Sequence, residues 1–361
     1  MSGATVLLAA IALGLVLTNG ADAAAGRRPV SGSNASSASL GADTAARRAR
    51  LSRVRTWGYQ LRIRDLAPLV TSATDMLVID HGYAARRLDK TTFAAADIAS
   101  LKTAAGGQRR IVLSYLSIGE AEQYRYYWQG PWCLRATAPK WLGKVNPNWP
   151  GNYPVRFWDP AWQRLILDPV DGYLAKIQAQ GFDGIYLDRA DVYGEWAAEN
   201  AHAEADMIVF LGRIATAARA RNRNFLIVMQ NAEELLAHPR VRQALDGVAK
   251  EDLLHGLKFT EDPNSPAEVA NSVADLARAR AGKLPVFAVE YLADPAAKAA
   301  ARQRLLALGY VPTFAPRLLD ALPPELAGQD AQPTADLPAA ASPAGPPGPA
   351  WAEGGPTCLT D

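Results

Sequence analysis

Residues 181 to 188 read Gly181-Phe182-Asp183-Gly184-Ile185-Tyr186-Leu187-Asp188, an apolar run that follows a glycine and ends on a carboxylate. A short run of β-branched and aromatic residues with such boundaries predicts a buried β-strand. Seven further runs of this kind occur in the chain. The eight predicted strands are 57–61, 76–80, 111–118, 184–188, 225–230, 247–251, 285–290 and 310–315.

The segments between these runs are longer and richer in Ala and Leu, as in 207–221 and 295–308. Alternation of strands with helical segments indicates βα units around a parallel sheet, an α/β fold. Eight units predict a single (β/α)8 TIM barrel, which we place at residues 55–320. A doubly wound open sheet is the alternative, because it needs neither closure nor an eighth strand.

The two ends of the chain differ from this pattern. The apolar run 6–17 has 12 residues, too few to span a bilayer. Small residues follow it, so we expect a signal peptide at 1–24, although no Lys or Arg precedes the run. The alternative is a buried segment of the fold. Residues 25–54 are expected to form a disordered linker, and 321–361 a flexible tail rich in Pro and Ala.

The two cysteines are Cys133 and Cys358. In an oxidising compartment they would form one disulfide between the body and the tail, and otherwise they remain two thiols. Four His and two Cys without CxxC or HExxH spacing make a zinc site of the usual spacings improbable, so we expect no such metal site.

The charge of the chain is nearly balanced, with 38 Lys and Arg against 36 Asp and Glu. Seven Arg and two acids lie in residues 1–55, which leaves 31 basic and 34 acidic residues in the rest. A slightly acidic body favours neutral or cationic ligands and excludes a strongly basic nucleic-acid binder.

A long irregular segment separates the third and fourth predicted strands. It contains six of the nine tryptophans, interleaved with prolines, at 128, 132, 141, 149, 158 and 162. Insertions that follow a barrel strand lie at the carboxyl face, where active sites are built. We therefore expect this Trp-rich insertion beside the site.

Acidic or amide residues recur where the predicted strands end. They are Asp80, Glu120, Asp188, Asp191, Gln230, Asn231, Glu233, Glu251, Asp252 and Glu290. Because side chains alternate along a strand, Asp188, Glu251 and Glu290 converge at the barrel mouth if their faces point inward. Burial of several carboxylates raises at least one pKa, and a protonated acid beside an ionised carboxylate is what glycosidic cleavage requires. The alternative for a single acid is a helix cap or an ion pair, such as Asp188 with Arg189.

Several motifs are similar to glycoside hydrolase family 114, which contains endo-α-1,4-polygalactosaminidases. They are Trp57-Gly58-Tyr59-Gln60-Leu61, Tyr115-Leu116-Ser117-Ile118-Gly119-Glu120-Ala121-Glu122, the 181–188 run, Gln230-Asn231 and Glu290-Tyr291. The resemblance covers about residues 55–320 and implies a secreted, retaining barrel enzyme that cuts α-1,4-linked galactosamine polymers without a cofactor.

By motif, the resemblance makes Asp188 the nucleophile and Glu251 the general acid/base, while Asp80 and Glu290 would hold the amine and hydroxyls of the sugar. Aromatic rings can stack on sugar rings or simply fill the interior. The remaining expected substrate contacts are Tyr59, Glu120, Trp128, Asp191, Asn231 and Tyr291.

As partner we expect a polysaccharide, with no nucleic acid and no stable membrane insertion. We also expect a monomer that is secreted, periplasmic or held in the cell envelope. Three alternatives remain: a barrel that binds polysaccharide without cleaving it, a hydrolase of another α-linked exopolysaccharide, and a divalent-metal site formed by the acids.

Overall fold

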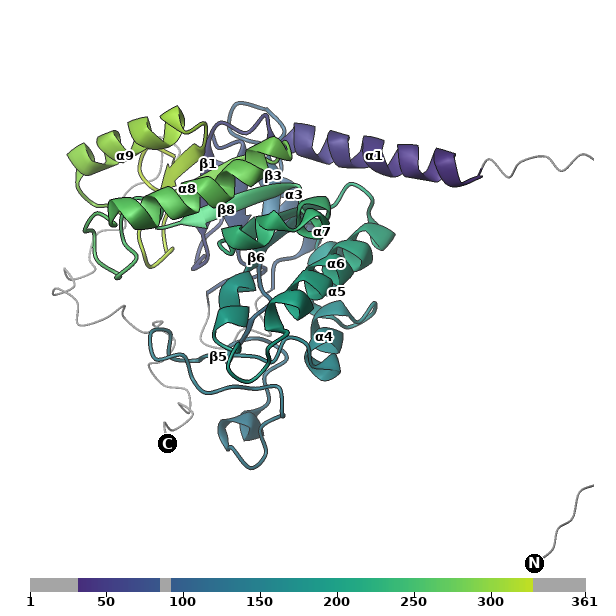
Figure 1. Cartoon of the computed structure of the whole chain (residues 1–361). Helices are drawn as coiled ribbons and strands as arrows, with labels where there is room; N and C mark the ends of the chain where they lie inside the picture. The colour runs from purple at the N-terminus through teal and green to yellow at the C-terminus, as the bar shows by residue number, and fades with distance from the viewer. Residues whose placement is uncertain (1–31, 85–91, 327–361) are drawn as a thin grey trace, which may run out of the picture. The chain divides into compact units, whose positions relative to one another are not determined.

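The computed structural model describes residues 32–84 and 92–326, with side chains from residue 41 onward. Within these ranges eight strands form one sheet in the order β1-β2-β3-β6-β7-β8-β9-β10 (Figure 1). They are β1 (Trp57–Gln60), β2 (Met76–Ile79), β3 (Ile111–Ser117), β6 (Gly184–Asp188), β7 (Leu226–Gln230), β8 (Gly247–Glu251), β9 (Val286–Glu290) and β10 (Val311–Phe314). All eight predicted strands are therefore confirmed.

Every pair of neighbouring strands in this sheet is parallel. No backbone ladder joins β1 to β10 in the described part of the chain. Instead, the indole nitrogen of Trp57 donates to the carbonyl of Val311 at 2.9 Å and links the two edges. The sheet is thus a nearly closed barrel, and the open-sheet alternative is wrong.

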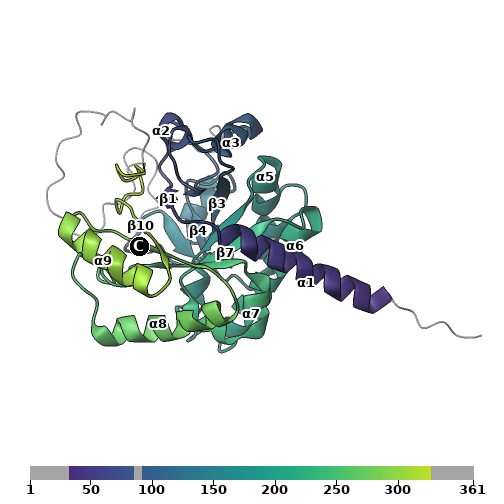
Figure 2. The ribbon, with the colours of Figure 1, turned by 90° about the horizontal axis from the view of Figure 1, so that it is seen from above.

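Helices surround the strands, as the view from above shows (Figure 2). The α-helices are α1 (Gly32–Leu51), α2 (Ala67–Val70), α3 (Ala95–Leu101), α4 (Pro160–Leu167), α5 (Tyr173–Ala179), α6 (Ala203–Arg221), α7 (Pro239–Ala244), α8 (Pro266–Ala281) and α9 (Pro295–Ala307), and the 3-10 helices are η2 (Gly130–Cys133), η3 (Ala190–Gly194) and η4 (Glu233–Ala237). Capping residues in the sequence mark where several of these helices begin. Ser265 and Glu268 form a capping box at α8, and Asp294 caps α9 ahead of a proline.

The barrel interior is filled by inward-facing aromatic and aliphatic side chains. Trp57, Tyr59, Tyr186 and Phe287 are at most 2% exposed. The rings of Tyr59 and Tyr186 lie 5.2 Å apart, from opposite sides of the interior. Since residues two apart share a face of a strand, Asp188 points inward with Tyr186 and lies above this packed floor.

The expected disordered linker is wrong from residue 41 onward, because these residues belong to α1 and its connection to β1. Arg47 donates to Asp246 at 2.9 Å, and Leu51 is fully buried in the barrel-interior cluster. The segment shows little amphipathic pattern because its anchors are Arg side chains that reach backbone and carboxylate groups far along the chain. The predicted signal peptide, the tail beyond residue 326 and Cys358 lie outside the described residues.

The Trp-rich insertion folds beside the barrel. The antiparallel strands β4 (Glu120–Glu122) and β5 (Asn152–Pro154) tie its two ends together. Trp132 and Trp141 have ring centroids 5.1 Å apart, and Trp141 lies 5.0 Å from Trp162. The buried Trp162 donates to the carbonyl of Ile118 at 2.9 Å. A chain of aromatic contacts therefore replaces regular secondary structure as the core of the insertion.

Candidate active site

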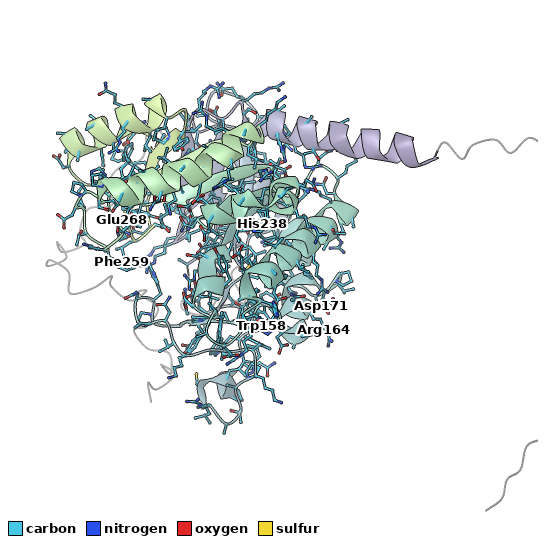
Figure 3. All side chains as sticks on the ribbon, viewed as in Figure 1. Trp158, Arg164, Asp171, His238, Phe259 and Glu268 are labelled. Atoms are coloured by element: carbon cyan, nitrogen blue, oxygen red, sulfur yellow. The ribbon has the colours of Figure 1, made fainter. Side chains whose placement is uncertain are left out.

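A cavity of about 1540 Å³ opens where the barrel strands end. Its floor is formed by residues at the carboxyl ends of strands from β1 to β9, and the insertion forms one wall. The loop between β8 and α8 contributes Phe259 to the lining (Figure 3). The volume and the open form suit a segment of a polymer better than a single small molecule.

Two carboxylates at the floor share one amide donor. The side-chain nitrogen of Gln230 lies 3.0 Å from Asp188 Oδ1 and 3.2 Å from Glu251 Oε2. The hydroxyl of Tyr186 donates to the Gln230 side-chain oxygen at 2.6 Å. Because this bond fixes which end of the amide carries the nitrogen, both of its N–H groups face the carboxylates.

Each carboxylate also accepts a bond from a tyrosine. Tyr115 donates to Asp188 Oδ2 at 2.7 Å, and Tyr291 donates to Glu251 Oε1. Asn231 completes the surroundings of Glu251, since the Glu251 backbone N–H donates to its side-chain oxygen at 3.1 Å. These contacts hold both acids in fixed rotamers at the cavity floor.

The environment raises the pKa of both acids. Burial, followed by the nearby charges of Asp252 and Asp188, raises the pKa of Glu251 to about 7. Burial and Asp191 also raise the pKa of Asp188, while the bond from Tyr115 opposes that rise. A carboxylic acid that stays protonated near neutral pH beside a second carboxylate can serve as a proton donor.

The backbone turns sharply where three of these strands end. Arg189, Asn231 and Asp252 all have φ between 50° and 61°, in the left-handed region. Each residue directly follows the last residue of β6, β7 or β8. Such non-glycine conformations cluster at functional sites, and here they follow the strand ends that carry Asp188, Gln230 and Glu251.

The neighbouring acids are held in ion pairs. Arg317 reaches both oxygens of Asp252, at 2.9 and 3.0 Å, and lies 4.4 Å from the ring centroid of Tyr291. Lys250 lies 3.1 Å from Glu233. Asp252 therefore adds negative charge next to Glu251 without being free to move.

The predicted contact Asp80 lines the cavity but is strongly paired. Its Oδ1 lies 2.6 Å from Arg125 and 2.8 Å from the ring nitrogen of His81. Although burial opposes ionisation, Arg125 and His81 hold the pKa of Asp80 well below its usual range. Tyr59 also reaches the lining.

The predicted contacts Glu120 and Asp191 lie on the lining near Arg189. Arg189 is 3.1 Å from Glu120 and 3.6 Å from Asp191. Asn146 donates to Glu120 at 2.8 Å. Burial outweighs these partners and raises the pKa of Glu120 to about 7.

Two expected substrate contacts are not among the residues that line this cavity. Glu290 is fully buried and accepts bonds from the backbone N–H groups of Leu254 and His255, at 2.8 and 3.1 Å. It holds the loop after β8 because its carboxylate turns toward that backbone. Trp128 packs against Tyr153, with ring centroids 4.8 Å apart, inside the insertion.

The pattern of strand-end acids gives no role to Tyr115 or to the side-chain amide of Gln230. The period-two alternation of β3 and β7 was the available signal, because Tyr115 and Gln230 lie on the inward faces. In the described ranges no group of three His, Cys, Asp or Glu residues is arranged to hold a metal ion.

A parallel eight-stranded barrel with two half-buried carboxylates held together at its mouth is the arrangement of TIM-barrel glycoside hydrolases. The chain belongs to glycoside-hydrolase family GH114, whose family model matches residues 38–322. The predicted family, fold and enzyme class are therefore confirmed, and the match starts within α1 rather than at residue 55.

Two relatives by sequence are an uncharacterized protein of Deinococcus radiodurans and one of Methanocaldococcus jannaschii. The first is 37% identical over 279 residues, which cover 75% of this chain and 83% of the relative. The second is 36% identical over 249 residues, 66% of each chain.

The glycoside hydrolase domain of PelA from Pseudomonas aeruginosa has a similar fold. It superposes with a TM-score of 0.57 at 20% identity, over 74% of this chain and 97% of that domain. Within residues 32–84 and 92–326, none of the helices has the length and apolar character that crossing a membrane requires.

Proposed function

We propose that this glycoside hydrolase is a retaining endo-enzyme that cleaves α-1,4-linked galactosamine polysaccharide. The observation that carries the proposal is the Gln230 amide, which bonds Asp188 and Glu251 at the same time. It puts the two acids close together at the floor of a long open cavity.

In the proposed reaction, ionised Asp188 attacks the anomeric carbon while protonated Glu251 gives its proton to the departing glycosidic oxygen. The bond between sugar and leaving oxygen breaks as the bond to Asp188 forms. Glu251 then takes a proton from water, and that water displaces Asp188 from the anomeric carbon. A pKa of Glu251 near 7 suits both proton transfers.

The distances support retention of anomeric configuration. Because one nitrogen lies 3.0 Å from Asp188 and 3.2 Å from Glu251, the bonded oxygens are at most about 6.2 Å apart, the sum of the two distances. Retaining glycosidases have carboxyl groups about 5 to 5.5 Å apart, and inverting ones about 6.5 to 9.5 Å.

The choice of galactosamine polymer as substrate is supported by the resemblance to the family and by the charge of the residues that line the cavity. Eleven acidic residues line the cavity, so an amino sugar with an ammonium group would meet complementary charge. We further propose that the protein is secreted after loss of residues 1–24 and acts as a monomer on an exopolysaccharide.

The test is incubation of the protein with partly deacetylated α-1,4-galactosamine polymer, beside the Glu251→Gln and Asp188→Asn variants. Mass spectrometry should find oligosaccharides from the unaltered protein alone, and NMR should find the α-anomer first. Binding without products from the unaltered protein would favour the polysaccharide-binding alternative. Neither binding nor products would mean that another α-linked polymer is the substrate.

A further inference from the structure

The cavity has two walls of opposite charge. The insertion wall consists of the lining residues within 123–158, a segment without any Asp or Glu. Its basic lining residues are Arg135, Lys140, Lys144 and Arg156. The barrel wall consists of the other lining residues and has eleven acidic residues against four basic ones.

Most cations of the insertion wall have no anionic partner among the residues that the structure describes. Arg156 binds Glu199, with one contact at 2.7 Å. In the described part of the chain, no ion pair involves Arg135, Lys140 or Lys144, and all three are exposed. Three positive charges of this wall therefore have no ion-pair partner among residues 32–84 and 92–326.

Three of the four cations of the barrel wall, in contrast, are in ion pairs. Arg189, Lys250 and Arg317 each pair with a carboxylate of the same wall. The four barrel-wall cations leave an excess of seven acidic residues, and the pairs of Asp80 with Arg125 and of Glu199 with Arg156 reduce this excess to five.

We propose that the cavity sorts sugar units by charge. Units with a free ammonium bind along the barrel wall, at and beside the point of cleavage, and the insertion wall accepts units without positive charge, such as N-acetylated hexosamines. Trp132 and Trp149 on the insertion wall offer apolar surface for an acetamido methyl group. This inference rests on the proposed function, and it makes the acetylation pattern of the polymer the determinant of where the chain is cut.

The size of the effect follows from the exposure of the cations. One solvent-exposed charge that lines the cavity changes the affinity for a charged sugar unit by about twofold to threefold. Three such charges acting on one ammonium group would disfavour it by about tenfold. Because exposed charges are screened over about 8 Å at physiological ionic strength, the effect should shrink as salt is added.

The experiment compares two polymers, one about half N-acetylated and one fully deacetylated. Binding of each to the protein in a Glu251→Gln background is measured first, and kcat/KM of the active protein second. The test variant is Lys140→Glu with Lys144→Glu. The control is Arg240→Glu with Lys283→Glu, which changes the net charge equally at exposed positions outside the cavity lining.

We expect the half-acetylated polymer to bind about tenfold more tightly than the deacetylated one, and the test variant alone to lose this preference. Sequenced products of the active protein should place acetylated units on one fixed side of the cut. Equal binding of both polymers, absence of binding to either, or an equal change in the control would overturn the inference. A binding preference without any products would support it while refuting the proposed function.

Discussion

Replacing Gln230 by Met tests how the two acids are held. Met has nearly the same length as Gln but donates no hydrogen bond, so Asp188 and Glu251 each lose one donor. A donor to a carboxylate favours its ionised form, and its loss raises the pKa. The pKa values of both acids should therefore rise in Gln230→Met.

The size of each pKa rise follows from the two hydrogen bonds that Gln230 donates. At 3.0 and 3.2 Å they are of ordinary length, and a hydrogen bond to a charged group contributes about 1.5 kcal/mol at the lower end of its range. One pKa unit corresponds to about 1.36 kcal/mol. Each pKa should rise by about one unit.

The assay is the pH dependence of kcat/KM. Activity requires ionised Asp188, so the acid limb should move about one unit toward higher pH, and the basic limb set by Glu251 should move in the same direction. The control is Gln163→Met, which removes a buried amide bonded to the carbonyl of Phe157, away from the cavity lining. An unmoved acid limb in Gln230→Met, or an equal shift in Gln163→Met, would refute the bridging role.

Three other outcomes are expected. Asp252→Asn removes a negative charge that raises the pKa of Glu251, so the basic limb of the pH profile should move below about 7; a limb that stays in place would contradict this cause. Arg47→Leu leaves Asp246 buried with one cation fewer, and urea unfolding should find a loss of about 3 kcal/mol, whereas the exposed Arg53→Leu should lose almost nothing. Excess EDTA should leave initial rates unchanged, and a loss restored by a divalent ion would revive the metal-site alternative.

Local pattern was sufficient for the strands. The runs 184–188 and 247–251 coincide with β6 and β8 because their inward side chains alternate and glycine marks where each begins. The same pattern singled out Asp188, Glu251 and Glu290 together, since a parallel strand delivers its last residue to the carboxyl face, and only the family resemblance assigned the catalytic roles to Asp188 and Glu251.

Partners distant in the chain decided the rest. Glu290 ends a strand as Asp188 does, yet it turns to the backbone of residues 254 and 255, and Asp80 is neutralised by Arg125 from the insertion. The segment that contains Arg47 looked structureless because its anchor, Asp246, lies 199 residues away. Sequence alone determined where the strands lie along the chain and which acids end them, because both features depend on residues that are neighbours in the chain. Only the tertiary structure decided which acids face the cavity and which are neutralised in ion pairs, because burial and Coulomb energy depend on distance in space.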